Sequence, residues 1–131
     1  MFKVNAKREL FYPIKLSQLK DDGSGEVNTI TIKIKYKLLT RKEMQDLVAH
    51  SKKEIELAAI NNTEIDELLK DDEKSVLERI TDWQGIVDYE TGKEIPFSQD
   101  ALLAVMEESH EFAAKVVEGL YFASRDLPVK N

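Results

Sequence analysis

Few side chains in this sequence have both the type and the spacing that catalysis or metal binding requires. The two histidines, His50 and His110, are sixty residues apart, and neither has a second potential ligand at helical spacing. Cysteine is absent, which excludes thiolate zinc sites and nucleophilic thiols. Because zinc sites and general bases depend so heavily on imidazole, we expect no metal here. We interpret His110 as the first residue of a helix and His50 as part of a solvated face.

An acidic loop holds three carboxylates, Asp88, Glu90 and Glu94. Oxygen ligands at this density suit calcium. A loop of the EF-hand type that begins at Asp88 needs glycine at its sixth position, however, and that position is Lys93. The sequence therefore predicts a turn here and no metal site.

No set of residues combines a nucleophile, a general base and a group that orients the base. Carboxylates are plentiful, but pairs such as Glu107 and Glu108 are adjacent in sequence, and adjacent residues on a helix do not face each other. The sequence therefore predicts a protein that is not an enzyme, with no catalytic residue, no cofactor and no metal ligand.

Three lysines, Lys33, Lys35 and Lys37, alternate along a predicted strand and so form a row on one face. Such a row can follow a nucleic-acid backbone, which makes a small nucleic-acid-binding or regulatory module the alternative function. Against nucleic acid, Tyr36 points to the opposite face and offers no stacking surface beside the lysines. The whole chain also carries a net charge of −6. We favour the interpretation that the lysines protect a sheet edge from association.

The elements around these residues begin with an N-terminal hairpin over residues 9–38, predicted from alternating apolar side chains. The apolar positions are Leu10, Tyr12, Ile14 and Leu16 in the first strand, and Val27, Ile30, Ile32, Ile34, Tyr36 and Leu38 in the second. Pro13 assigns the first strand to the edge of a sheet, because proline cannot donate a hydrogen bond. An isolated two-stranded ribbon is marginal in water, so we expect helices to cover the apolar face.

Capping signatures place those helices. Thr40 and Glu43 form a capping box, and Ser98 and Ser109 are the expected N-caps of two short C-terminal helices. The segment from Thr63 to Ile80 has the pattern of either one helix or two, and both interpretations stay open. The helix after Ser98 is expected to bury Leu102, Leu103, Val105 and Met106.

These elements predict an α+β fold in which an N-terminal antiparallel β-hairpin packs on a mostly α-helical body of about four to five helices. The length of 131 residues fits a single domain over residues 1–131, with the hairpin at 9–38 and the helical body at 40–125. Residues 1–42 hold ten Lys or Arg against four Asp or Glu, a net of +6, so the rest of the chain carries −12. No apolar run approaches the ~20 residues that span a bilayer, so we expect no membrane partner.

The stretch WQGIVDYETGKEIPFS, from Trp83 to Ser98, holds the only tryptophan of the chain and two of its five glycines. Trp83 follows Ile80 by three residues, which is helical spacing, so we predict that it closes the apolar face of a helix that includes Ile80. The turn residues that follow are expected to form a joint before the last helices.

This stretch, with the helix that contains Leu102 and Leu103, resembles the pattern seen in tail assembly chaperones of long-tailed bacteriophages and prophages. The remaining layout is similar: an N-terminal hairpin, a Thr-capped helix, an acidic middle and a small C-terminal helical pair. The resemblance covers roughly residues 10–123, apart from residues 61–73, which do not align.

The resemblance implies a non-enzymatic protein of the bacterial host cytoplasm. It would bind the tape measure protein and keep its long apolar helix soluble until tail tube subunits replace the chaperone. Such chaperones can self-associate, and they often occur also as a longer product of ribosomal frameshifting.

Holding an amphipathic helix needs an apolar groove between helices. We place this partner-binding groove on the helices after Ser98 and beside Trp83, with Phe112, Val116, Leu120 and Tyr121 as its lining. The alternative, which general burial preferences favour, is that these four residues of the last helix fill the core.

Overall fold

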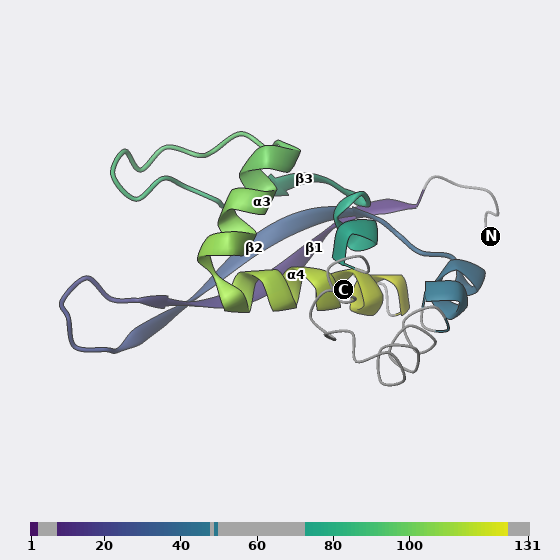
Figure 1. The fold of residues 1–131 in the computed structure, drawn as a ribbon, viewed down its shortest axis with the longest axis horizontal. Coiled ribbons are helices and arrows are strands. Elements are labelled where there is room, and N and C mark those ends of the chain that lie inside the picture. The colour runs from purple at the N-terminus through teal and green to yellow at the C-terminus, as the bar shows by residue number, and fades with distance from the viewer. Residues whose placement is uncertain (3–7, 48, 50–72, 126–131) are drawn as a thin grey trace, which may run out of the picture.

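The structure, a computed structural model, describes residues 1–2, 8–47, 49 and 73–125. Three antiparallel strands form a sheet in the order β1–β2–β3. The strands are β1 (Glu9–Leu19), β2 (Val27–Lys37) and β3 (Ile80–Gln84). The helices are α3 (Gln99–Glu108), α4 (His110–Arg125) and the segments 41–47 and 73–77. The predicted α+β fold with an N-terminal hairpin and a helical body is confirmed (Figure 1).

The hairpin has the apolar face and the lysine face that the alternation predicted. Ile14 lies opposite Ile32 and Tyr12 opposite Ile34, so apolar residues of both strands share one face. β1 lies at an edge of the sheet, as Pro13 predicted. The tight turn is made possible by Gly23 and Gly25, whose φ angles are +74° and +80°.

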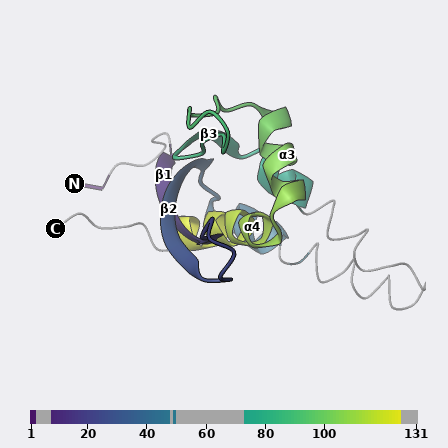
Figure 2. The same ribbon diagram turned by 90° about the vertical axis from the view of Figure 1, so that its left-hand side faces the viewer.

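α3 and α4 lie on the same side of the sheet (Figure 2), and the buried apolar side chains of the strands form one core cluster with those of the helices. The buried residues of the strands are Ile14, Leu16, Ile32, Ile34, Tyr36, Ile80 and Trp83, and those of α4 include Phe112, Val116, Leu120 and Ala123. The hairpin thus obtains from the helices the cover that a two-stranded ribbon needs in water.

The prediction of a helix through Ile80 and Trp83 was wrong, because residues 80–84 form β3. In the pairing with β2, Tyr36 lies opposite Ile80 and Lys35 opposite Asp82, so Thr81 is an extra residue. This bulge turns both Ile80 and Trp83 toward the core, where they are 1% and 6% exposed. A three-residue spacing that is typical of a helix therefore arises here from a strand with a bulge.

The predicted caps are confirmed. Thr40 and Glu43 make the reciprocal hydrogen bonds of a capping box, each 3.1 Å long. The Ser98 hydroxyl accepts a hydrogen bond from Ala101 N, and the Ser109 hydroxyl accepts one from Phe112 N, so α4 begins at His110 as expected. The helix that contains residues 73–77 ends before Ile80, and the predictions for residues 50–72 lie outside the described residues.

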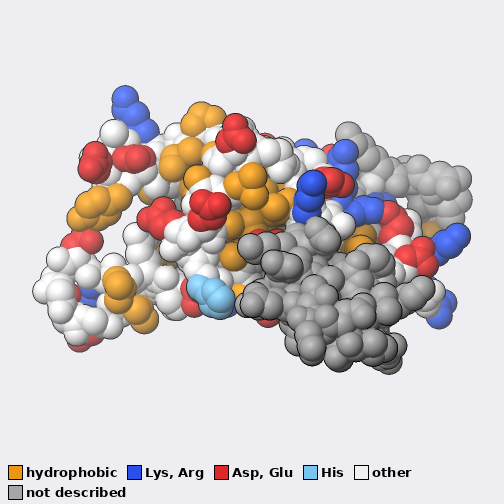
Figure 3. All heavy atoms as spheres, viewed as in Figure 1, with side chains coloured by type: hydrophobic (Ala, Val, Ile, Leu, Met, Phe, Trp, Pro, Cys, Tyr) orange, Lys and Arg blue, Asp and Glu red, His pale blue; other side chains and the backbone are white. Residues whose placement is uncertain are grey.

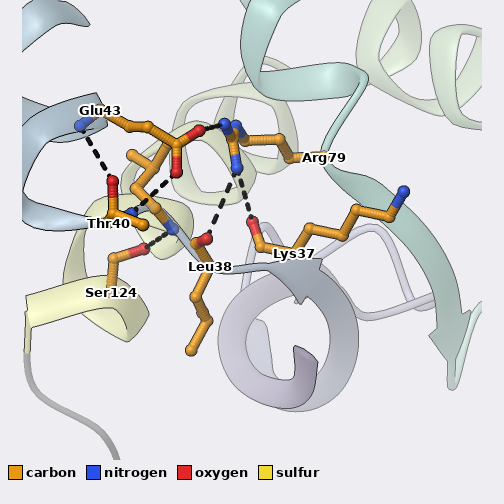
Figure 4. Close-up of polar contacts among 7 residues, drawn as sticks. Lys37, Leu38, Thr40, Glu43, Arg79 and Ser124 are labelled. Atoms are coloured by element: carbon orange, nitrogen blue, oxygen red, sulfur yellow. Dashed lines mark hydrogen bonds and ion pairs between the residues drawn. The ribbon is translucent and has the colours of Figure 1, made fainter. Parts of the chain in front are cut away.

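Arg79 links the end of β2 to the helical segment 41–47 (Figure 4). Its guanidinium forms an ion pair with Glu43 and donates to the carbonyl oxygens of Lys37 and Leu38, each at 3.5 Å. Two residues after the end of β2, Leu39 N donates to the hydroxyl group of Ser124 in α4 at 2.9 Å. The chain leaving the sheet is therefore fixed to the capped helix and to α4 at once.

A candidate partner-binding groove

Four of the five predicted partner-binding residues lie in the core. Phe112, Val116 and Leu120 are at most 2% exposed and Trp83 is 6% exposed. Only Tyr121 is partly buried and so presents some surface to solvent. The alternative interpretation, that the residues of the last helix fill the core, describes the position of Phe112, Val116 and Leu120.

Trp83 anchors the loop that follows β3. Its indole Nε1 donates to the carbonyl oxygen of Ile95 at 2.7 Å, and its ring meets that of Phe97 edge to face, with centroids 5.4 Å apart. These contacts hold residues 95–97 against the strand. The interpretation of this stretch as a joint agrees with its geometry.

A groove with an apolar floor lies between the helical segment 73–77 and α3, the first of the helices after Ser98. Its volume is about 570 Å³. The lining residues are Glu73, Lys74, Leu77, Glu78, Gln99, Leu103, Met106 and Glu107. Figure 3 shows hydrophobic side chains at the surface over α3, in the view of Figure 1.

One side chain fixes the two walls of this groove relative to each other. The amide nitrogen of Gln99, at the start of α3, donates to the carbonyl oxygens of Leu77 and Ile80 at 3.3 and 3.2 Å. The carbonyl group of Leu77, at the end of one helix, and that of Ile80, at the start of β3, therefore receive a donor from the beginning of α3. As a result the start of α3 lies beside the end of segment 73–77.

The floor of the groove is apolar and its rim is acidic. Leu77 and Met106 are 7% exposed, whereas Leu103 is 45% exposed. Around them stand three carboxylates, those of Glu73, Glu78 and Glu107, and one ammonium group, that of Lys74. A large aliphatic side chain that is exposed to solvent between two helices is typical of a binding groove.

The sequence prediction that Leu103 is buried was wrong, and this error concealed the groove. Adjacent residues on a helix point about 100° apart, so Leu102 and Leu103 cannot both face the same core. Leu102 is fully buried and is followed by Met106 four residues later, which leaves Leu103 on the outer side. The spacing of Leu102 and Met106 was the signal that could have identified it.

The acidic loop forms a turn, as predicted. The Asp88 carboxylate accepts hydrogen bonds from the backbone N–H groups of Glu90 and Thr91 at 2.9 and 3.0 Å. Bonds of this kind favour the charged form, and they lower the pKa of Asp88. Within the described part of the chain, no group of three or more potential ligands could hold a metal ion.

The lysine row lies on β2, on the face of the sheet opposite the buried residues. Because β2 is the central strand, the interpretation that these lysines protect a sheet edge was wrong. Lys33 and Lys37 are exposed. Lys35 Nζ lies 5.5 Å from the centre of the Phe11 ring and 3.9 Å from a carboxylate oxygen of Glu9. The middle lysine of the row thus already has an anionic and an aromatic neighbour within the chain.

Comparison of the chain with protein-family models, with curated proteins and with solved structures found no match. Among the helices that the structure describes, none has the length and apolar character needed to cross a membrane.

Proposed function

We propose that this protein is a non-catalytic binding protein that holds an apolar helix of a partner in the groove between segment 73–77 and α3. The observation that carries this proposal is the solvent-exposed side chain of Leu103 above the buried side chains of Leu77 and Met106. Isolated exposed leucines are common on proteins, but this one lies in a groove of about 570 Å³.

Within this class, we propose that the protein is a tail assembly chaperone of a long-tailed bacteriophage or prophage. Its partner is then the tape measure protein, with tail tube subunits and further copies of the chaperone as additional partners, all in the host cytoplasm. The resemblance in the stretch from Trp83 to Ser98 supports this identity, and the α+β fold with its helical end is compatible with it.

The groove suits such a partner for physical reasons. Residues at i, i+4 and i+7 of α3, namely Gln99, Leu103 and Met106, line one wall of the groove. An amphipathic partner helix binds such a groove through apolar anchor residues on one of its own faces. In this proposal Phe112, Val116 and Leu120, which were first assigned to the partner-binding groove, stabilise the core of the fold.

The alternative, a nucleic-acid-binding module, depends on the row Lys33, Lys35 and Lys37 alone. Since Lys35 already lies beside Glu9 and Phe11, only two lysines of this row are exposed to a phosphate backbone. The groove is therefore the stronger basis for function.

The proposal requires a tape measure protein from the same phage or prophage, and co-expression of the two proteins tests it. We expect the tape measure protein to be soluble and to co-purify with the wild-type chain. With the variant Leu103→Asp, we expect both its solubility and its co-purification to be lost. The matched control is Phe122→Asp on α4, which changes a side chain of similar exposure, 48%, outside the groove. Circular dichroism establishes that both variants fold. An insoluble tape measure protein in the presence of the wild-type chain contradicts the proposal.

A further inference from the structure

We infer that the occupant of the groove is a basic amphipathic helix, one whose apolar stripe is flanked at both ends by lysine or arginine. This inference rests on the proposed function, because it takes the groove as the binding site. It adds a charge requirement, which arises from the carboxylates that surround Leu103.

The carboxylates lie toward both ends of the groove. Glu78 directly follows Leu77, whose carbonyl group is bound by Gln99 at the start of α3. Glu107 lies eight residues after Gln99, which corresponds to about 12 Å along a helix. Glu73 begins the opposite wall. A helix lying along the floor therefore passes acidic side chains at its entry and at its exit, about two turns apart.

The balance of charge around the floor is acidic. Glu73, Glu78 and Glu107 stand against the single ammonium group of Lys74. Cations on a partner are attracted to such a rim, and anions are repelled. An apolar floor supplies affinity without distinguishing one amphipathic helix from another, so the rim is the part of this site that selects.

A helix fits this site better than a second copy of the same groove. Two identical grooves that face each other across a twofold axis bring Glu78 and Glu107 of one copy close to the same acidic rim of the other. Like charges placed this way oppose association. An anionic lipid surface meets the same repulsion. A cationic helix is the occupant that satisfies both the apolar floor and the acidic rim.

Calorimetric titration of the full chain with three synthetic helical peptides tests this inference. The peptides share one apolar stripe and carry Lys, Gln or Glu at the flanking positions. We expect the Lys peptide to bind about tenfold more tightly than the Gln peptide and the Glu peptide to bind most weakly, with the differences shrinking at high salt.

The double variant Glu78→Lys/Glu107→Lys should reverse this order, so that the Glu peptide binds best. The matched control Glu90→Lys/Glu118→Lys makes the same change in net charge away from the groove and should leave the order unchanged. A reversal in both variants would mean that net charge acts at long range, and it would overturn the inference.

The remaining outcomes separate the two proposals. Equal binding of all three peptides, abolished by Leu103→Asp, overturns the charge requirement and leaves the apolar groove as the binding site. Binding of none of them overturns the inference, and the co-expression experiment then decides independently whether the chaperone function stands. If sedimentation shows a dimer that Leu103→Asp dissociates, a second copy occupies the groove and the inference is wrong.

Discussion

Tyr36 on β2 and Gly119 on α4 fit closely together in the core. The Tyr36 hydroxyl is buried and donates to the carbonyl oxygen of Val116 at 2.6 Å. A Cβ atom on Gly119 would lie 2.5 Å from this hydroxyl oxygen and 3.2 Å from Ile14 Cδ1. Glycine is unfavourable inside a helix, and here it makes room for the tyrosine.

The variant Gly119→Ala tests this fit. In an ordinary helix interior this change stabilises by up to about 1 kcal/mol, but here we expect destabilisation of about 1–3 kcal/mol, because the methyl group overlaps the hydroxyl. Urea denaturation followed by circular dichroism measures the change. In a Tyr36→Phe background, which lacks the hydroxyl, the penalty should become smaller. Stabilisation by Gly119→Ala in the wild-type background would contradict the packing.

Tyr36 also makes stability depend on pH in the alkaline range. Burial raises the pKa of its phenol well above the usual value of about 10. Above pH 10 the unfolded chain releases a proton that the folded chain keeps, so the free energy of unfolding falls as pH rises, by up to about 1.4 kcal/mol per pH unit. Below that pH this contribution is constant.

Denaturation at pH 9 to 11 measures this effect. The variant Tyr36→Phe should lack this part of the pH dependence. The control Tyr89→Phe, which alters a side chain that is 77% exposed, should retain it. Equal slopes for the wild type and Tyr36→Phe would show that Tyr36 is not the group responsible.

Among the elements, α4 protects the free edge of β1. In an antiparallel pair, every second residue of a strand bonds to the neighbouring strand. In β1 these are the even-numbered residues, because Leu38 N donates to Arg8 O at one end of the hairpin and Lys20 N donates to Glu26 O at the other. The odd-numbered residues therefore direct their backbone groups away from β2. Pro13 has no N–H to offer. Lys115 Nζ donates to the carbonyl oxygen of Lys15 at 2.9 Å, and Ser17 N donates to the Glu111 carboxylate at 2.5 Å. Glu111 and Lys115 are one helical turn apart, which matches two residues of a strand.

The double variant Glu111→Ala/Lys115→Ala should therefore expose this edge. We expect it to stay folded, because exposed polar contacts contribute little to stability, typically under about 1 kcal/mol each. Its sedimentation coefficient should rise with concentration more steeply than that of the wild type, as unpaired edges associate. The control Glu90→Ala/Lys93→Ala removes one charge of each sign in the loop after β3 and should behave as the wild type does.

What could be predicted from the sequence at this scale were features set by neighbouring residues. The hairpin follows from strict alternation, and the caps at Thr40, Ser98 and Ser109 follow from side chains that bond within three residues. β3 could not be predicted, because its pairing joins Trp83 to Ile34 across the intervening chain and depends on a bulge. The local spacing of apolar residues carries no information about this pairing or about the bulge.

At the scale of the whole molecule, the sheet separates the two kinds of charge that the sequence distinguished. The lysine row lies on one face of the sheet, and the groove with its acidic rim lies among the helices on the other face. Composition revealed that the chain has a basic beginning and an acidic remainder. Composition could not reveal the groove, because that site combines residues that precede β3 in the sequence with residues that follow it. It also depends on which leucine of α3 faces outward. The single-domain organisation over residues 1–131 stays a prediction.

Trp83 gives the molecule a built-in optical reporter. It is the only tryptophan in the chain, it is buried, and its ring is held by Phe97 and by the Ile95 carbonyl group. All intrinsic indole emission therefore comes from one place, where β3 meets the loop that leads to α3. A red shift of that emission marks the opening of this joint, so its detachment can be followed in real time without attaching a dye.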